Sequence, residues 1–249
     1  MIIRHVFILT IISLNLLCCK SQVKPAKNVS MQNLRGYPLI ENIDSIKQFL
    51  KQKCLDTINF KKREIIADVG AGNGYLEGML SLFNDSLAFY IQDIDTSICN
   101  QKTVDKVVDF YKRLKEKPFT NKFYVVNGSD VETNLPDETF DKILMIFTYP
   151  YLKYPQVFIT DIKQKLKPDG RMYIINPDVP INDLTKSLKA EYGWNESPID
   201  KEINDIIGCG FELISKSKYS YTNKRGNPYI MVFKQKNPKK LTSSYGDNF

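Results

Sequence analysis

Residues 65–76 read IIADVGAGNGYL, a short apolar run followed by alternating glycines. The apolar run predicts a buried strand, and Gly70, Gly72 and Gly74 predict a sharp turn whose backbone can approach a ligand closely. Backbone N–H groups at the start of the next helix suit a polar or anionic group. The spacing is GxGxG, so the GxGxxG pattern of dinucleotide-binding loops is not met. An ordinary tight turn is the alternative, but three alternating glycines after Asp68 make it the minor one.

Strands and helices alternate on both sides of this stretch. Helical spacing from Leu39 to Leu50 predicts a helix ahead of the first strand. Alternating β/α units predict an α/β fold with a doubly wound, Rossmann-like, mostly parallel seven-stranded sheet, in which two β-rich C-terminal segments add an antiparallel hairpin. The expected strands are 64–69, 87–92, 122–126, 139–147, 171–175, 211–221 and 229–235, and the helices between them are 74–83, 97–115, 156–166, 184–192 and 200–207. Residues 167–170 are expected to form the turn before the fifth strand, and 222–228 the hairpin turn.

The chain begins with a short basic region, Arg4 and His5, and an apolar run, Val6–Leu17, that is too short to span a bilayer. It ends in Cys18 and Cys19. This start resembles a bacterial lipoprotein signal, which implies lipidation at Cys19, a membrane anchor and a place in the cell envelope, on the periplasmic or surface side. Cys18 departs from that pattern, since the preceding slot usually holds a small residue. An ordinary signal peptide or an uncleaved anchor are the alternatives, and a chain without a signal would be cytoplasmic.

Four segments follow from this interpretation. Residues 1–19 are the predicted signal, 20–36 a polar tether, 37–236 the folded domain and 237–249 a polar tail. A single α/β domain fits a length of 249 residues.

Charge and residue types exclude several classes of function. The formal charge is +7, but the lysines are scattered and often lie beside acids, as at 61–64. They are expected to form a solvated surface, and no nucleic-acid partner is expected. The only histidine, His5, lies inside the predicted signal, which excludes a histidine base from the mature protein. No CxxC spacing occurs, so no metal site is predicted.

Acids follow the later strands where a ligand of such a sheet would bind. Asp93 ends the second strand about 20 residues past the glycines, where a carboxylate can accept hydrogen bonds from both ribose hydroxyls. Asp95 or Thr96 is expected to cap the next helix, which leaves Asp93 for the ribose. After the third strand, Asp130 can accept a hydrogen bond from an adenine amino group, with the backbone N–H of Val131 beside the ring. A simple turn is the alternative for Asp130.

These elements together resemble the class I S-adenosylmethionine (SAM)-dependent methyltransferase family. The resemblance covers roughly residues 39–235, and its pieces are 68–74, Asp93, 128–131, 135–141, 166–170 and 210–213. It implies SAM as cofactor, with Gly70, Gly72 and Gly74 on the methionine part. It also implies that Asp93 contacts the ribose and Asp130 the adenine, while Asp68 orients the loop or contacts the methionine amino group.

The acceptor side is less well defined by the sequence. Many members of the family carry a histidine or an Asn-Pro-Pro-aromatic motif after the fourth strand, and this chain has neither. Tyr149 and Tyr151 are candidates to line an acceptor pocket, with packing under the next helix as an equal alternative. Asn176 follows the fifth strand at the same rim. The methyl acceptor is left open among a small molecule, a lipid and a protein group, and a non-catalytic SAM-binding or scaffolding lipoprotein is the alternative function.

Overall fold

The computed structural model describes residues 39–177, 199–219 and 228–236, all within the compact unit Asn33–Phe249. The predicted signal, tether and tail lie outside these residues. So do the predicted helix at 184–192 and the connection at 220–227 between the last two strands. Within the described residues no helix is long and apolar enough to cross a membrane.

The described strands form one seven-stranded sheet in the order β3-β2-β1-β4-β5-β7-β6, and all neighbours pair in parallel except β7, which is antiparallel to β5 and β6. The predicted fold class is therefore confirmed. In chain order the elements are α1 (Ile43–Gln52), η1 (Leu55–Thr57), β1 (Ile65–Val69), α2 (Tyr75–Phe83), β2 (Ala88–Asp93), α3 (Gln101–Leu114), β3 (Lys122–Asn127), β4 (Phe140–Ile146), η2 (Tyr149–Tyr151), α4 (Pro155–Lys165), β5 (Leu166–Pro177), α6 (Ile199–Gly208), β6 (Phe211–Lys218) and β7 (Pro228–Gln235).

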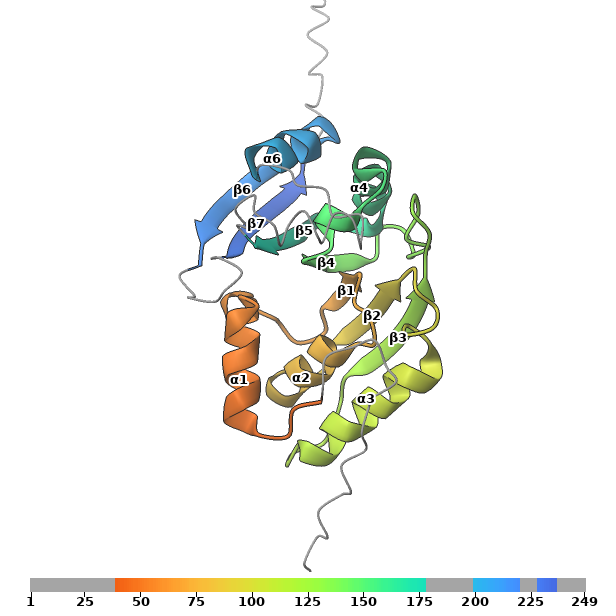
Figure 1. Cartoon of the computed structure of the whole chain (residues 1–249), viewed down its shortest axis with the longest axis vertical. Coiled ribbons are helices and arrows are strands. Elements are labelled where there is room, and N and C mark those ends of the chain that lie inside the picture. Colours follow the sequence, from red (N-terminus) through yellow and green to blue (C-terminus); the bar gives the residue numbers. More distant parts are fainter. Residues whose placement is uncertain (1–38, 178–198, 220–227, 237–249) are drawn as a thin grey trace, which may run out of the picture. The chain divides into compact units, whose positions relative to one another are not determined.

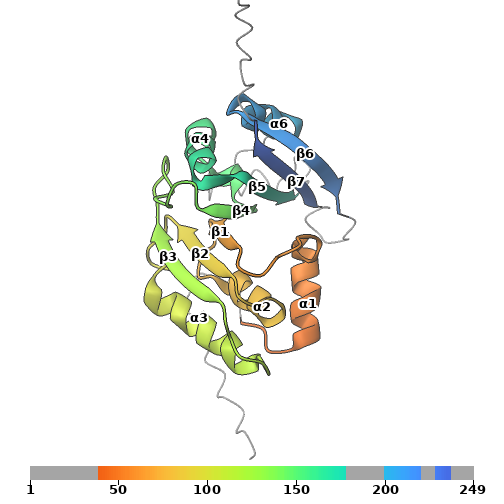
Figure 2. The ribbon, with the colours of Figure 1, turned by 180° about the vertical axis from the view of Figure 1, so that it is seen from behind.

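Helices cover both faces of this sheet. Figures 1 and 2 show α1, α2 and α3 beside the β1–β3 half, and α4 and α6 beside the β4–β7 half. Ala67 and Val69 of β1 belong to the hydrophobic core that includes residues of α4 and α6. The side chain of Asp68 points to the opposite face, because successive side chains of a strand alternate. Its neighbour there is Glu77 of α2.

The fifth strand differs from the prediction. It begins at Leu166, so residues 167–170 form an irregularity within β5 and no separate turn. Leu166 pairs with Phe140 and Arg171 with Lys142, so β5 carries three extra residues between these pairs. At Gly170 a Cβ atom would lie 2.7 Å from the carbonyl oxygen of Phe140, which makes glycine necessary where the two strands approach.

The third helix also begins later than predicted. Asn100 is the N-cap of α3, and its side chain accepts a hydrogen bond from the N–H of Thr103 at 3.0 Å. Asp95 instead accepts from the N–H of Ser97 at 2.9 Å, in the turn before the helix. The predicted cap at Asp95 or Thr96 was therefore wrong, because a second good capping residue follows a few positions later.

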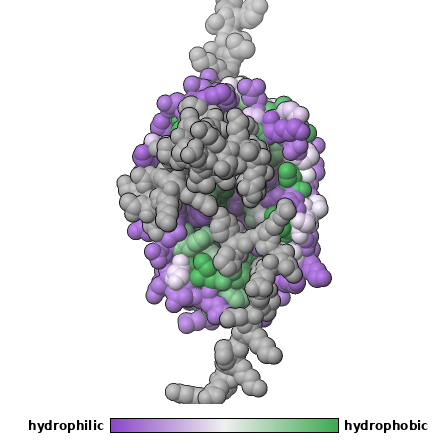
Figure 3. Space-filling view, in the orientation of Figure 1, coloured by the Kyte–Doolittle hydropathy of each residue, from purple (hydrophilic) through white to green (hydrophobic). Residues whose placement is uncertain are grey.

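Several lysines are internal, which corrects the prediction of a purely solvated basic surface. Lys142 is buried and pairs with Glu64, the acid of the 61–64 cluster. Lys165 is also buried, and it lies 2.7 Å from Asp137. The outer surface visible in Figure 3 is otherwise mostly hydrophilic, with small apolar patches.

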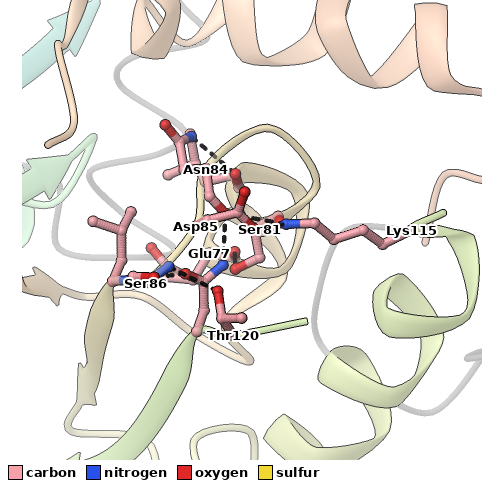
Figure 4. Close-up of polar contacts among 10 residues, drawn as sticks. Glu77, Ser81, Asn84, Asp85, Ser86, Lys115 and Thr120 are labelled. Carbon is pink, nitrogen blue, oxygen red and sulfur yellow. Dashed lines mark hydrogen bonds and ion pairs between the residues drawn. The ribbon is translucent and has the colours of Figure 1, made fainter. Parts of the chain in front are cut away.

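Lys115 joins the end of α2 to the start of β2. Its ammonium donates to the carbonyl oxygens of Ser81 and Asn84, and it pairs with the carboxylate of Asp85 at 2.7 Å (Figure 4). A cation at this position also compensates the negative end of the helix dipole. Its side chain is nearly fully buried, and the ammonium also lies 5.6 Å from the centre of the Phe119 ring.

We expect Lys115→Met to lower the free energy of unfolding by about 2 kcal/mol, because acceptors at the end of α2 lose their donor while the apolar volume is kept. Urea denaturation measures this change. Lys106→Met, at an exposed position of α3, is the control and should change stability by less than about 0.5 kcal/mol. Equal stabilities of the two variants would contradict the assigned role of Lys115.

Candidate functional site

The glycine loop follows β1 at the carboxyl edge of the sheet. Gly70, Gly72 and Gly74 have φ angles of 77°, 60° and 76°, a region that other residues rarely adopt. At Gly70 a Cβ atom would lie 2.4 Å from the hydroxyl oxygen of Thr148, and at Gly74 3.2 Å from Ile91. Backbone conformation and close packing therefore both require glycine at the first of these positions, and conformation requires it at all three.

Asp93 ties this loop to the end of β2. One carboxylate oxygen accepts from the N–H of Gly72 at 2.9 Å, and the other accepts from the N–H of Asp95 at 2.9 Å. The N–H groups of Gly70 and Ala71 donate to the carbonyl oxygen of Gln92. The structure thus brings together the predicted glycine loop and the predicted ribose ligand, with Asp93 only half buried.

Asp68 lies directly beneath the loop and has a buried acidic neighbour. Both it and Glu77 are shielded from solvent, and the three oxygens Asp68 Oδ1, Glu77 Oε1 and Glu77 Oε2 have no hydrogen-bond partner. Burial, followed by the charge of Glu77, raises the pKa of Asp68 well above its usual range, and burial raises the pKa of Glu77. Burial of two acids side by side thus disfavours the ionisation of both carboxyl groups together. The sequence analysis missed Glu77, although an acid within the otherwise apolar helix α2 was a signal.

The predicted adenine contacts lie on the surface after β3. The carboxylate of Asp130 is 3.7 Å from the ammonium of Lys153, and both side chains are exposed. Val131 is exposed as well, and its N–H donates to the hydroxyl of Ser129 at 3.3 Å. A neighbouring residue, Gly128, connects this turn to the ribose position by donating its N–H to the carbonyl oxygen of Asp93 at 3.2 Å.

The segment after β4 separates the two candidate acceptor tyrosines. Tyr149 is buried in the core beneath α4 and α6, whereas the side chain of Tyr151 is 43% exposed. The hydroxyl of Tyr149 nevertheless has no hydrogen-bond partner. The segment starts at Phe147, whose φ angle of 61° is unusual for a large side chain and marks backbone strain at the end of β4. Lys53 lies over the ring of Phe147, 4.0 Å from its centre.

Asn176, the third candidate on the acceptor side, contacts a residue that the sequence analysis did not single out. Its amide nitrogen donates to Glu202 of α6 at 2.7 Å, and both side chains are buried. Burial raises the pKa of Glu202 to about 7, while the hydrogen bond from Asn176 lowers it. The helical pattern of α6 gave no sign that one of its acids faces inward.

Buried polar atoms without partners gather at this edge of the sheet. Among the described residues every such atom belongs to a side chain at or just after the carboxyl end of a strand, or to α2 directly beneath the loop: Asp68, Asn73, Glu77, Gln92, Tyr149 and Asn176. Buried polar groups are normally hydrogen-bonded, so a concentration of exceptions marks a place built for a polar ligand.

A comparison with protein families agrees with this geometry. Residues 67–174 match the family described as "Methyltransferase domain". The matched region runs from β1 into β5 and contains the glycine loop, Asp93 and the segment after β4. No curated protein matches the sequence significantly.

Solved structures share the fold at low sequence identity. The mitomycin 7-O-methyltransferase MmcR is 12% identical with a TM-score of 0.57, covering 77% of this chain and 54% of its own, so the chain spans about half the length of MmcR. A chain of the complex between the Haloferax volcanii Trm112 methyltransferase activator and the putative methyltransferase is 11% identical, with a TM-score of 0.57 and coverages of 78% and 93%. A putative methyltransferase from Bacillus halodurans is 12% identical, with a TM-score of 0.53 and coverages of 79% and 99%.

The class that these findings define is that of the Rossmann-like methyltransferase fold. The family match is to a methyltransferase domain, and the solved structures share the fold of this chain.

The pKa of Glu202 predicts how stability depends on pH. A carboxyl group whose pKa is raised from 4.5 to about 7 on folding binds more protons in the folded chain between these values. The free energy of unfolding therefore falls as pH rises from about 4.5 to 7, by up to about 3 kcal/mol from this group. We expect Glu202→Gln to remove this part of the pH dependence, so that the variant gains stability relative to the wild type as pH rises.

Urea denaturation between pH 4.5 and 8 measures the difference between the two proteins. Glu116→Gln is the control, because Glu116 is exposed and its charge is not desolvated. The control should run parallel to the wild type, and a parallel curve for Glu202→Gln would rule out the buried, uncompensated state of this acid.

Proposed function

We propose that this chain is a SAM-dependent methyltransferase that transfers the sulfonium methyl group to an acceptor by in-line displacement. The observation that carries the proposal is the glycine loop at the carboxyl edge of β1, held by the carboxylate of Asp93 at the end of β2. Ligands of such sheets bind at this edge, near the point where the strand order reverses. Here that point lies between β1 and β4.

We assign the cofactor contacts to the predicted residues. Gly70, Gly72 and Gly74 surround the methionine part, and their positive φ angles give the loop the sharp turn that brings its backbone close to the cofactor. Asp93 accepts hydrogen bonds from the ribose hydroxyls with the lone pairs that the loop does not use.

Two further sets of groups complete the proposed cofactor site. Asp130 and the N–H of Val131 contact the adenine. Asp68, with its partner Glu77, provides negative charge for the methionine ammonium, since a cation nearby favours the ionised form of this buried pair.

The chemistry needs alignment more than proton transfer. The sulfonium group supplies an already activated methyl, so the protein accelerates transfer mainly by fixing the acceptor in line with the breaking bond. We propose that the acceptor binds beside the ends of β4 and β5, near Tyr149, Tyr151 and Asn176. Its identity among small molecules, lipids and protein groups is left open.

Calorimetry of the full chain in detergent should show binding of both SAM and S-adenosylhomocysteine. Asp93→Ala should weaken this binding by at least tenfold, about 1.4 kcal/mol, because charge-assisted hydrogen bonds to the ribose and the support of Gly72 are lost. Asp109→Ala, at an exposed position of α3, should bind as the wild type does.

Absence of heat with either compound, for a sample that melts cooperatively, would refute the proposed function. Binding without transfer to any acceptor would favour a scaffolding or ligand-binding lipoprotein on the same fold. Unchanged affinity in Asp93→Ala would show that Asp93 does not bind the ribose.

We also propose that a lipid on Cys19 anchors the protein in the cell envelope, on the periplasmic or surface side. The support is the sequence at residues 1–19, with its basic start, short apolar run and cysteine. Metabolic labelling with palmitate should mark the wild type and leave Cys19→Ala unlabelled. Labelling of both proteins would show that the lipid is attached to another residue. Labelling of neither protein would refute the proposed lipid anchor.

A further inference from the structure

Three buried polar side chains from three elements meet beside the end of β5. Asn176 comes from β5, Glu202 from α6 and Tyr149 from η2 after β4. Asn176 donates to Glu202 at 2.7 Å, which leaves its own carbonyl oxygen without a partner. The Tyr149 hydroxyl also lacks a partner, and burial, followed by the nearby charge of Glu202, raises its pKa. We call these three residues the α6 cluster.

The α6 cluster is connected to the glycine loop by direct contacts. The N–H of Phe147, the residue after β4, donates to the carbonyl oxygen of Ile175 in β5 at 2.7 Å, so the end of β4 lies beside the residue that precedes Asn176. The next residue, Thr148, occupies the space that a Cβ at Gly70 would fill. One residue therefore separates the loop from Tyr149, and one hydrogen bond separates the end of β4 from the strand that carries Asn176.

Glu202 is held in an environment that only partly compensates its charge. Asn176 faces it from β5 and Tyr149 from η2, and neither carries a charge at neutral pH. On its own helix Asp205 raises the pKa of Glu202 and Lys201 lowers it, but burial is the largest cause and raises it. An acid poised in this way, next to unpartnered polar atoms, can exchange a proton with a ligand near neutral pH.

The other buried acids lie elsewhere. Asp68 and Glu77 are on the opposite face of β1, beneath α2, whereas Tyr149 shares its core with α4 and α6. The chain beyond the predicted signal contains no histidine to serve as a base. Among the described carboxylates, Glu202 is thus the one that combines burial with a place on the acceptor side of the loop.

We propose that Glu202 is the proton acceptor of the methyl-transfer reaction, positioned by Asn176 beside Tyr149, so that the methyl acceptor is a hydroxyl or a protonated amine. This inference rests on the proposed function. It names the chemical class of the acceptor: a group that must lose a proton to be methylated, in contrast to a thioether or a ring nitrogen with a free lone pair.

The step balances without a further reactant. For a hydroxyl acceptor, the oxygen forms its bond to the methyl carbon while the sulfur–carbon bond breaks, and the electron pair of that bond goes to sulfur. The O–H proton passes to a carboxylate oxygen of Glu202. The products are S-adenosylhomocysteine, the methyl ether and neutral Glu202, which returns its proton to solvent before the next cycle.

A proton-release experiment tests the position of Glu202 without a known acceptor. SAM carries a sulfonium charge and S-adenosylhomocysteine does not, so only SAM stabilises an ionised carboxylate facing the methyl group. Calorimetry of the full chain at pH 6.5, in two buffers of different ionisation enthalpy, counts the protons released with each compound. We expect SAM to release roughly half a proton more in the wild type than in Glu202→Gln, after subtraction of the value for S-adenosylhomocysteine.

Asp200→Asn is the matched control, because it removes a carboxylate from the first turn of the same helix, where Asp200 pairs with Lys216 on the surface. It should release the same number of protons as the wild type. Equal release in Glu202→Gln and the wild type would overturn the inference while leaving the proposed function intact. If the wild type binds neither SAM nor S-adenosylhomocysteine, the result would instead count against the proposed function itself.

The wild type alone provides a second measurement that needs no variant to fold. As Glu202 ionises, SAM should gain affinity relative to S-adenosylhomocysteine, by roughly fivefold between pH 5.5 and 7. A ratio of dissociation constants that stays constant over this range would show that no group of this kind faces the methyl, and would overturn the inference.

Discussion

The sharp turn after the central strand β1 is the constraint on which the rest of this structure depends. Three glycines at positive φ let the chain reverse within a few residues, and a single carboxylate, that of Asp93, fixes the turn against β2. On the other side Thr148 packs against the bare backbone of Gly70. The ends of β1, β2 and β4 are thereby brought together, and the proposed contacts to the methionine part and the ribose lie at the first two of these ends.

The sequence was sufficient for those features that depend on local pattern. The mostly parallel seven-stranded sheet and its antiparallel C-terminal strands agree with the structure, because alternating apolar segments and turn residues are local signals. The start of α3 depended on competition between Asp95 and Asn100 as caps, and the start of β5 on a backbone pairing between Phe140 and Leu166. Neither the choice between the two caps nor the pairing of the two strands can be predicted from one segment of sequence alone.

In the candidate site, too, some residues were predictable from local sequence pattern and others were not. Gly70 and Asp93 were predicted from spacing alone, since both act through the backbone at a strand end. Glu77 and Glu202 were missed because helical acids are ordinarily solvated, and only the packed structure shows them facing inward. The described residues thus hold two buried acidic sites on opposite faces of one sheet. Burial tunes these acids toward neutral pH, at a cost in folding stability.

The position of β7 has a consequence for how the chain acquires its fold. This strand is the last of the described elements, yet it lies between β5 and β6, and β6 pairs with no other strand. During synthesis β6 therefore has no partner until Pro228–Gln235 has been made. The edge of the sheet that holds β6 can therefore be completed only after the glycine loop and Asp93 have long been made.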